Sequence, residues 1–229
     1  MIPIICALDT HNLKKTIAFA HSLYNRVSMI KLGLEFFTAH GLSGVREIAK
    51  CNIPIFLDLK LHDIPSTVSR VIEVISHLNI AMVTLHVMGG AKMLQEALHA
   101  ADGTNIKLIG VTVLTSIDNN DLNECGVLRE VQSQVVLLAK FAKKIGLYGI
   151  VCSACEAQAV HKVCGRDFIV IVPGIRIETL ADDQKRISTP ECAINLGADY
   201  IVIGRLITQS ADPIRKLEFI RQSLLVTNQ

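Results

Sequence analysis

The sequence predicts a single (β/α)8 barrel, and three observations lead to this fold class. Short runs rich in β-branched residues alternate with longer amphipathic stretches, at intervals of about 20 to 35 residues. Eight such units fit in the 229 residues, whereas a doubly wound open sheet more often has about five or six strands. Polar residues follow almost every apolar run, as at the carboxyl ends of barrel strands. We therefore expect residues 1–229 to form one domain.

The eight apolar runs define the expected strands in chain order. They are residues 4–8, 29–32, 55–60, 82–86, 108–114, 149–152, 168–172 and 200–204. The stretches between them have helical patterns with recognisable ends. A basic segment and glycine at 143–146 close one helix, residues 189–191 open another, and Asp212 with Pro213 opens the last.

Composition and charge argue against several other classes of protein. No run of about eighteen apolar residues is present, and the first residues resemble no signal peptide, so we expect a cytoplasmic protein without membrane binding. The net charge of +2 is spread over interspersed residues, and Trp is absent, which argues against nucleic-acid binding. The seven cysteines include Cys152 and Cys155, but no second ligand pair accompanies them, so we expect reduced thiols.

The segment 55–65 places acid and base side chains in an apolar strand. Its leucines lie on one face, while Asp58 and Lys60 lie on the other, because strand side chains alternate with period two. An unpaired buried charge costs several kcal/mol, so this pattern indicates a functional site more than a structural ion pair. Lys31 and Asp63 extend the pattern to alternating charges, in which two lysines keep two carboxylates ionised.

A second set of residues points to an anionic ligand. Gly174 and Gly204 follow the seventh and eighth expected strands, where barrels often bind phosphate, and Arg176 and Arg205 come soon after them. The alternative is a pair of ordinary surface arginines after turn glycines. We predict a phosphorylated small molecule, with the polar stretch 178–188 as a flap over the phosphate.

Taken together, these motifs resemble the orotidine 5′-phosphate decarboxylase family over practically the whole chain. The matching segments are Asp58-Leu-Lys60-Leu-His-Asp63-Ile-Pro65, Ala7-Leu8-Asp9, Ile30 to Gly33, Val111 to Ser116, Pro173-Gly174-Ile175-Arg176, Asp183-Gln184 and Gly204-Arg205. The first string is specific, and the length is similar to that of the short bacterial form. Ser66 stands where many members carry Asn, and since it is also small and polar we expect no change of function.

The resemblance implies conversion of orotidine 5′-monophosphate (OMP) to uridine 5′-monophosphate (UMP) and carbon dioxide, the last step of de novo pyrimidine synthesis, without metal or organic cofactor. It implies that Lys60 protonates C6, that Asp58 lies against the substrate carboxylate, and that Lys31 holds the charged array. Asp63 and Thr67 would reach the neighbouring subunit's site, which makes the active unit a homodimer.

The resemblance also implies a set of substrate contacts. Asp9 and Lys31 would bind ribose hydroxyls, Thr115 or Ser116 the pyrimidine edge, and Arg176, Gln184 and Arg205 the phosphate, with Pro173 and Gly204 beside them. Two alternatives stay open. One is a keto-gulonate-phosphate decarboxylase or hexulose-phosphate synthase, which would use magnesium and an enediolate. The other is a catalytically silent barrel that only binds a phosphorylated ligand.

Overall fold

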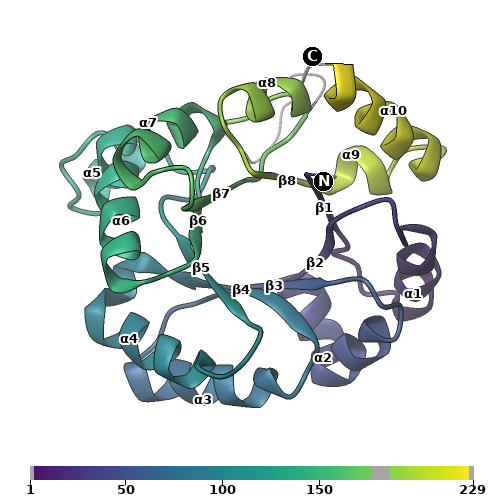
Figure 1. The fold of residues 1–229 in the computed structure, drawn as a ribbon, viewed down its shortest axis with the longest axis horizontal. Coiled ribbons are helices and arrows are strands. Elements are labelled where there is room, and N and C mark those ends of the chain that lie inside the picture. The colour runs from purple at the N-terminus through teal and green to yellow at the C-terminus, as the bar shows by residue number, and fades with distance from the viewer. Residues whose placement is uncertain (1–2, 177–185, 227–229) are drawn as a thin grey trace.

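The computed structural model describes residues 3–176 and 186–226, and its strands form one closed barrel (Figure 1). In this part of the chain the strands are β1 Ile4–Ala7, β2 Met29–Gly33, β3 Ile55–Leu61, β4 Ile80–His86, β5 Lys107–Val111, β6 Gly149–Val151, β7 Ile169–Val172 and β8 Tyr200–Ile203. Each strand pairs in parallel with the next one, and β8 pairs with β1. The predicted (β/α)8 barrel is confirmed.

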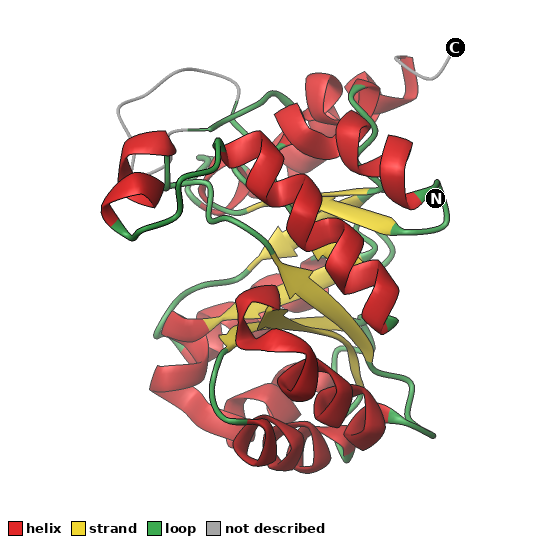
Figure 2. Cartoon of the chain, turned by 90° about the vertical axis from the view of Figure 1, so that its left-hand side faces the viewer, coloured by secondary structure: helices red, strands yellow, loops and turns green. Residues whose placement is uncertain are grey.

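Helices surround the barrel and cover the outer face of its strands (Figures 1 and 2). They are α1 Leu13–Ser22, α2 Leu34–Ala49, α3 Pro65–Ser76, α4 Gly90–Ala101, α5 Asn119–Glu124, α6 Val131–Ile145, α7 Ala154–Cys164, α8 Pro190–Asn195, α9 Arg205–Thr208 and α10 Pro213–Val226, with a short 3-10 turn, η1, at Val87–Gly89. The predicted helix ends are confirmed: Gly146 caps α6 in a left-handed conformation, and Thr189 caps α8 through its side chain.

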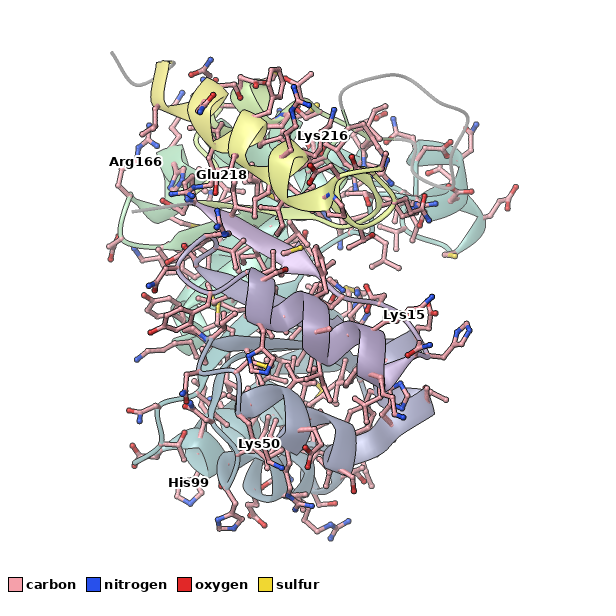
Figure 3. The ribbon with its side chains drawn as sticks, turned by 90° about the vertical axis from the view of Figure 1, so that its right-hand side faces the viewer. Lys15, Lys50, His99, Arg166, Lys216 and Glu218 are labelled. Atoms are coloured by element: carbon pink, nitrogen blue, oxygen red, sulfur yellow. The ribbon has the colours of Figure 1, made fainter. Side chains whose placement is uncertain are left out.

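The alternation of strand side chains separates two apolar cores. Phe56, Met82 and Ile109 point into the barrel, whereas Leu57 and Val83 pack between the strands and the helices. Charged side chains such as those of Lys15 and Lys50 lie on the outside of the helices (Figure 3). None of the described helices combines the length and apolar character needed to cross a membrane.

The fifth strand is shorter than its sequence predicts. We expected it to continue to residue 114, but β5 ends at Val111, which pairs with the last residue of β6, Val151. Beyond this point the chain has no neighbouring strand to complete a ladder, so β-branched residues alone do not extend the sheet. Residues 112–116 instead form a loop at the barrel mouth.

Candidate active site

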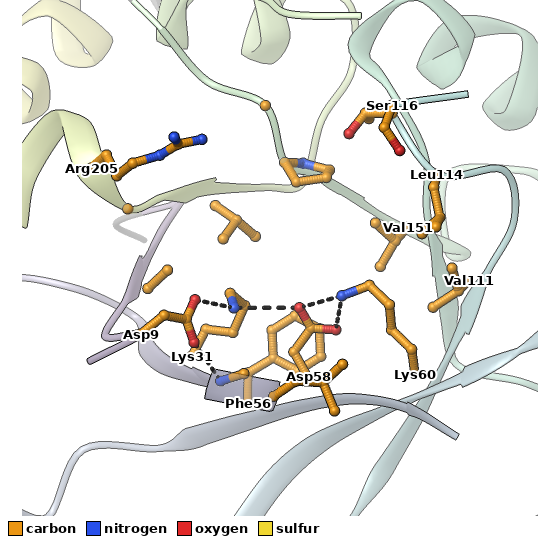
Figure 4. Close-up of a pocket in the computed structure, with 18 of the residues that line it drawn as sticks. Asp9, Lys31, Phe56, Asp58, Lys60, Val111, Leu114, Ser116, Val151 and Arg205 are labelled. Carbon is orange, nitrogen blue, oxygen red and sulfur yellow. Dashed lines mark hydrogen bonds and ion pairs between the residues drawn. The ribbon is translucent and has the colours of Figure 1, made fainter. Parts of the chain in front are cut away.

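A cavity of about 720 Å³ opens at the carboxyl ends of the strands, where (β/α)8 barrels carry their sites (Figure 4). Its volume is within the usual range for a small-molecule pocket. The predicted residues that line it are Asp9, Lys31, Asp58, Lys60, Thr115, Ser116, Pro173, Arg176, Gly204 and Arg205. The fold therefore brings together residues that come from six different strand ends.

Four charged side chains form a row along one wall of this cavity (Figure 4). The Lys31 ammonium lies 2.9 Å from Asp9 and 3.4 Å from Asp58. The Lys60 ammonium lies 2.9 and 3.0 Å from the two oxygens of Asp58. The Gly33 amide donates to Asp9 at 2.8 Å, and a Cβ at this position would lie only 2.4 Å from that carboxylate oxygen. A side chain at position 33 would therefore displace the Asp9 carboxylate from its place in the row.

The two central members of the row are both charged at neutral pH. Burial alone raises the pKa of Asp58, but the Lys31 and Lys60 ammonium groups outweigh it, and the net pKa is lowered. Burial alone lowers the pKa of Lys31, but the Asp58 and Asp9 carboxylates outweigh it, and the net pKa is raised. The site thus holds fixed opposite charges in a largely dehydrated wall.

The lowered pKa of Asp58 predicts a pH-dependent contribution to stability. A carboxyl whose folded pKa is below its unfolded value of about 4 stabilises the fold above that pH and loses this effect as the pH falls. We expect Asp58→Asn to lower the melting temperature at pH 7 and to differ less from the wild type as the pH falls below about 4. Thermal unfolding from pH 2 to 7 measures this. The exposed Asp102→Asn is the control, and a difference that stays constant with pH would contradict the prediction.

The end of β3 departs from a regular strand. From Leu57 to Leu61, β3 advances four residues, while its partner β4 advances two, from Val83 to Leu85, so β3 carries two extra residues. Lys60 lies in this bulge with a φ of 50°, a conformation that is unfavourable for a residue with a side chain. Asp58 and Lys60 still share the inner face, as the alternation predicted.

The opposite part of the cavity has the features of an anion site. Gly174 follows β7 with a φ of 76°, which a side chain would strain, and lies beside Arg176. Arg205 begins α9 directly after β8 and lies across the cavity from Lys60 (Figure 4). The predicted contact residue Gln184 and most of the 178–188 flap lie outside the described residues.

A partly buried arginine missed by the sequence reasoning ties two loops of the rim to the first turn of α7. The Arg186 guanidinium pairs with Glu156 at 2.5 Å and donates to the carbonyl oxygens of Val113 and Leu114 at 3.1 and 3.0 Å. The second oxygen of Glu156 accepts from the Ser153 amide at 2.8 Å. The bonds from Arg186 to Val113 and Leu114 hold the loop that carries Thr115 and Ser116. Its partners are far apart in the sequence, so no local motif indicated it.

Two predicted site residues do not join the cavity of their own chain. Asp63 is exposed after the end of β3, and its side chain accepts from the Ile64 amide at 2.7 Å. Thr67 lies in the first turn of α3 and does not line the cavity either. The carboxylate that pairs with Lys31 on the side away from Asp58 is Asp9, not Asp63. In the described part of the chain, neither side chain lines the cavity of its own subunit.

Several apolar residues complete the walls of the cavity. Phe56 lies beneath the charged row, and Val111 and Val151 come from other strands (Figure 4). Val202 of β8 also lines the cavity. They occupy the inward positions of their strands, so the period of two was the signal that would have identified them. Their apolar surface keeps the charges in a poorly hydrated environment, where electrostatic interactions are stronger.

These features define an enzyme of the (β/α)8-barrel class, with the charged row at one end of its cavity and two arginines at the other. Residues 3–220 match the model of the "Orotidine 5'-phosphate decarboxylase / HUMPS family", and the chain belongs to this family.

Similar proteins agree with this assignment over nearly the whole chain. Orotidine 5'-phosphate decarboxylase of Wolbachia pipientis subsp. Culex pipiens is 63% identical, covering 98% of this chain and 99% of that protein. The Ehrlichia canis protein of the same name is 57% identical, with 97% of each chain covered. The crystal structure of the Lactobacillus acidophilus enzyme of this name superposes with a TM-score of 0.82 at 32% identity, covering 98% of this chain and 99% of that one.

Proposed function

We propose that this protein decarboxylates OMP to UMP and carbon dioxide in the described cavity, with Lys60 as the proton donor. The reaction class follows from the family and from the named relatives: the enzyme is a carboxy-lyase of pyrimidine biosynthesis. The observation that supports the residue roles is the row of Lys31, Asp58 and Lys60. It lies at strand ends and coincides with the specific part of the sequence motif.

The proposed chemistry uses the charges in this row. The substrate carboxylate lies near Asp58, and loss of carbon dioxide leaves the electron pair of the broken C–C bond on C6. The Lys60 ammonium is held against Asp58 and offers a positive charge to this developing carbanion, then transfers a proton to C6. Because the charges are positioned before the reaction, they stabilise the transition state without rearranging solvent.

The other lining residues have roles in binding. Asp9 and Lys31 bind ribose hydroxyls, and Thr115 or Ser116 contacts the pyrimidine edge. Arg176 and Arg205 bind the phosphate, with Pro173 and Gly204 forming the adjacent wall. All of these residues line the cavity, which supports their assignment. The proposed phosphate contact of Gln184 rests on the sequence motif alone.

A direct assay tests the function against its nearest rival, a magnesium-dependent enzyme acting on a sugar phosphate. The matched family also carries the name HUMPS, so the family model does not separate the two. We expect the ultraviolet absorbance change of OMP loss to proceed at the same rate with and without EDTA. Absence of OMP turnover, or a requirement for magnesium, would overturn the proposal. A barrel that only binds its ligand would give no turnover at all.

The phosphate contact predicts a selective loss of affinity. We expect Arg205→Ala to raise the Kd for UMP by about 10- to 100-fold, because a charge-assisted hydrogen bond is lost, while the affinity for uridine changes little. Calorimetry with UMP and a competition assay with uridine measure the two affinities. Arg215→Ala on α10 is the control, since Arg215 lies outside this cavity. Equal losses for both ligands would assign Arg205 to the fold.

We also propose a homodimer in which each subunit completes the other's site through Asp63 and Thr67. Support comes from Asp63, which is exposed, and from the next residue, Ile64, whose large apolar side chain is 63% exposed.

A cytoplasmic location is the last part of the proposal. All seven cysteines are free thiols, and four of them are buried. Burial raises the pKa of the Cys152 thiol well above its usual value, and the nearby Glu156 carboxylate raises it further. Cys152 is therefore an unreactive part of the cavity wall. Free cysteines in this number are typical of a reducing compartment.

A further inference from the structure

Thr84 is a fully buried polar residue that lies directly beneath the charged row. It belongs to β4, has an exposed fraction of 0%, and points into the barrel between Met82 below and the site above. Its hydroxyl oxygen accepts from the backbone amide of Lys60 at 2.8 Å. The same hydroxyl donates to Oδ1 of Asp58 at 2.9 Å. One hydroxyl thus contacts both residues of the Lys60–Asp58 pair.

The bulge in β3 explains why a side chain is needed at this point. Lys60 lies in this bulge, where the two extra residues of β3 interrupt its regular pairing with β4. A buried amide without a partner is costly. The Thr84 hydroxyl is the acceptor for the Lys60 amide in this irregular segment and also supports the left-handed backbone of Lys60, whose φ is 50°.

The second bond of this hydroxyl fixes the carboxylate. Oδ1 of Asp58 accepts from Thr84 and from the Lys60 ammonium, whereas Oδ2 faces both Lys31 and Lys60. The Thr84 donor therefore sets the rotation of the carboxylate, and this rotation sets the place of the Lys60 ammonium. A hydroxyl is required because the position must accept and donate at the same time.

We propose that Thr84 is a positioning residue of the decarboxylase, which holds the backbone of Lys60 and the carboxylate of Asp58 in the geometry needed for proton transfer. This inference rests on the proposed function. Thr84 does not line the cavity and so acts through its two partners. Its loss is expected to affect the chemical step and to leave the binding of the nucleotide phosphate unchanged.

The test compares variants that keep or remove the hydroxyl. Thr84→Val has nearly the same shape without the hydroxyl, and we expect its kcat to fall by about 10- to 100-fold, since small displacements of reacting groups have effects of this size. The Kd for UMP is expected to stay within about threefold, because UMP is held by groups at the other end of the cavity. Thr84→Ser keeps the hydroxyl and is expected to retain most of the wild-type kcat.

Thr112→Val is the matched control. Thr112 is also a buried threonine at a strand end, but its hydroxyl bonds the carbonyl of Val151 at 2.7 Å and not the charged row. We expect this variant to keep its kcat within about threefold, because none of the charged groups loses a hydrogen bond. Equal losses of kcat in Thr112→Val and Thr84→Val would indicate a general effect of removing a buried hydroxyl and would overturn the proposal.

The remaining outcomes are also decisive. Unchanged kcat in Thr84→Val, with the wild type converting OMP in the same assay, would reject the positioning role without affecting the proposed function. A parallel loss of UMP affinity would likewise assign Thr84 to the fold. If Thr84→Val does not fold, Thr84→Ala is measured in its place with the same expectation. Failure of both hydroxyl-free proteins to fold would show a structural role and overturn the proposal.

Discussion

Lys60→Ala is expected to abolish decarboxylation, lowering kcat by about 10⁴-fold or more, because the variant loses both the proton donor and the positive charge beside C6. Binding of UMP is expected to remain nearly intact. The product carries no developing carbanion, and its phosphate is proposed to bind at the part of the cavity with Arg176 and Arg205. Single-turnover measurements with OMP and calorimetry with UMP separate the two effects.

The control for this experiment is Lys162→Ala, which removes an exposed lysine from α7. It should leave both kcat and UMP affinity unchanged. In the Lys60 variant, Asp58 keeps its contacts with Lys31 and Thr84, so the carboxylate is not left unpaired and the protein should fold. If Lys60→Ala retained more than a small fraction of the wild-type turnover, Lys60 would not be the proton donor.

Mixing two inactive variants is expected to restore activity if the sites are shared between subunits. Lys60→Ala and Asp63→Ala should each be inactive as homodimers. In a heterodimer, one site then contains both defects and the other contains neither, because each subunit supplies the same residue to its partner across a two-fold axis. After complete subunit exchange, about a quarter of all sites would be intact. The measurement is OMP turnover before and after exchange.

The position of Asp63 makes this experiment informative. Its side chain is exposed and does not line the described cavity of its own barrel, so the experiment separates a role in its own site from a role in a neighbour's site. Exchange must be monitored separately, for example with differently tagged subunits. Proven exchange without recovery of activity would rule out the shared site. The Lys162→Ala protein mixed with Asp63→Ala provides the comparison, since both subunits of its heterodimers keep Lys60.

Much of the architecture could be predicted because it depends on local patterns. Apolar runs of strand length alternate with amphipathic stretches, and this alternation is enough to indicate eight βα units. The same local logic placed Asp58 and Lys60 on one face of β3 and identified the glycines and arginines after β7 and β8. The end of β5 was the exception, because a strand stops where its neighbour stops and not where its own propensity declines.

The sequence by itself thus predicted the barrel, the location of its site and the residues that we propose bind the anionic group of the substrate. Only the tertiary structure decided how the side chains of different strands meet. It paired Lys31 with Asp9, directed Asp63 away from the cavity, and put the hydroxyl of Thr84 against a bulge in β3. The Lys31–Asp9 and Lys60–Thr84 contacts join residues 22 and 24 positions apart, and they depend on register and barrel closure. Neither is encoded in the local alternation of apolar and polar residues.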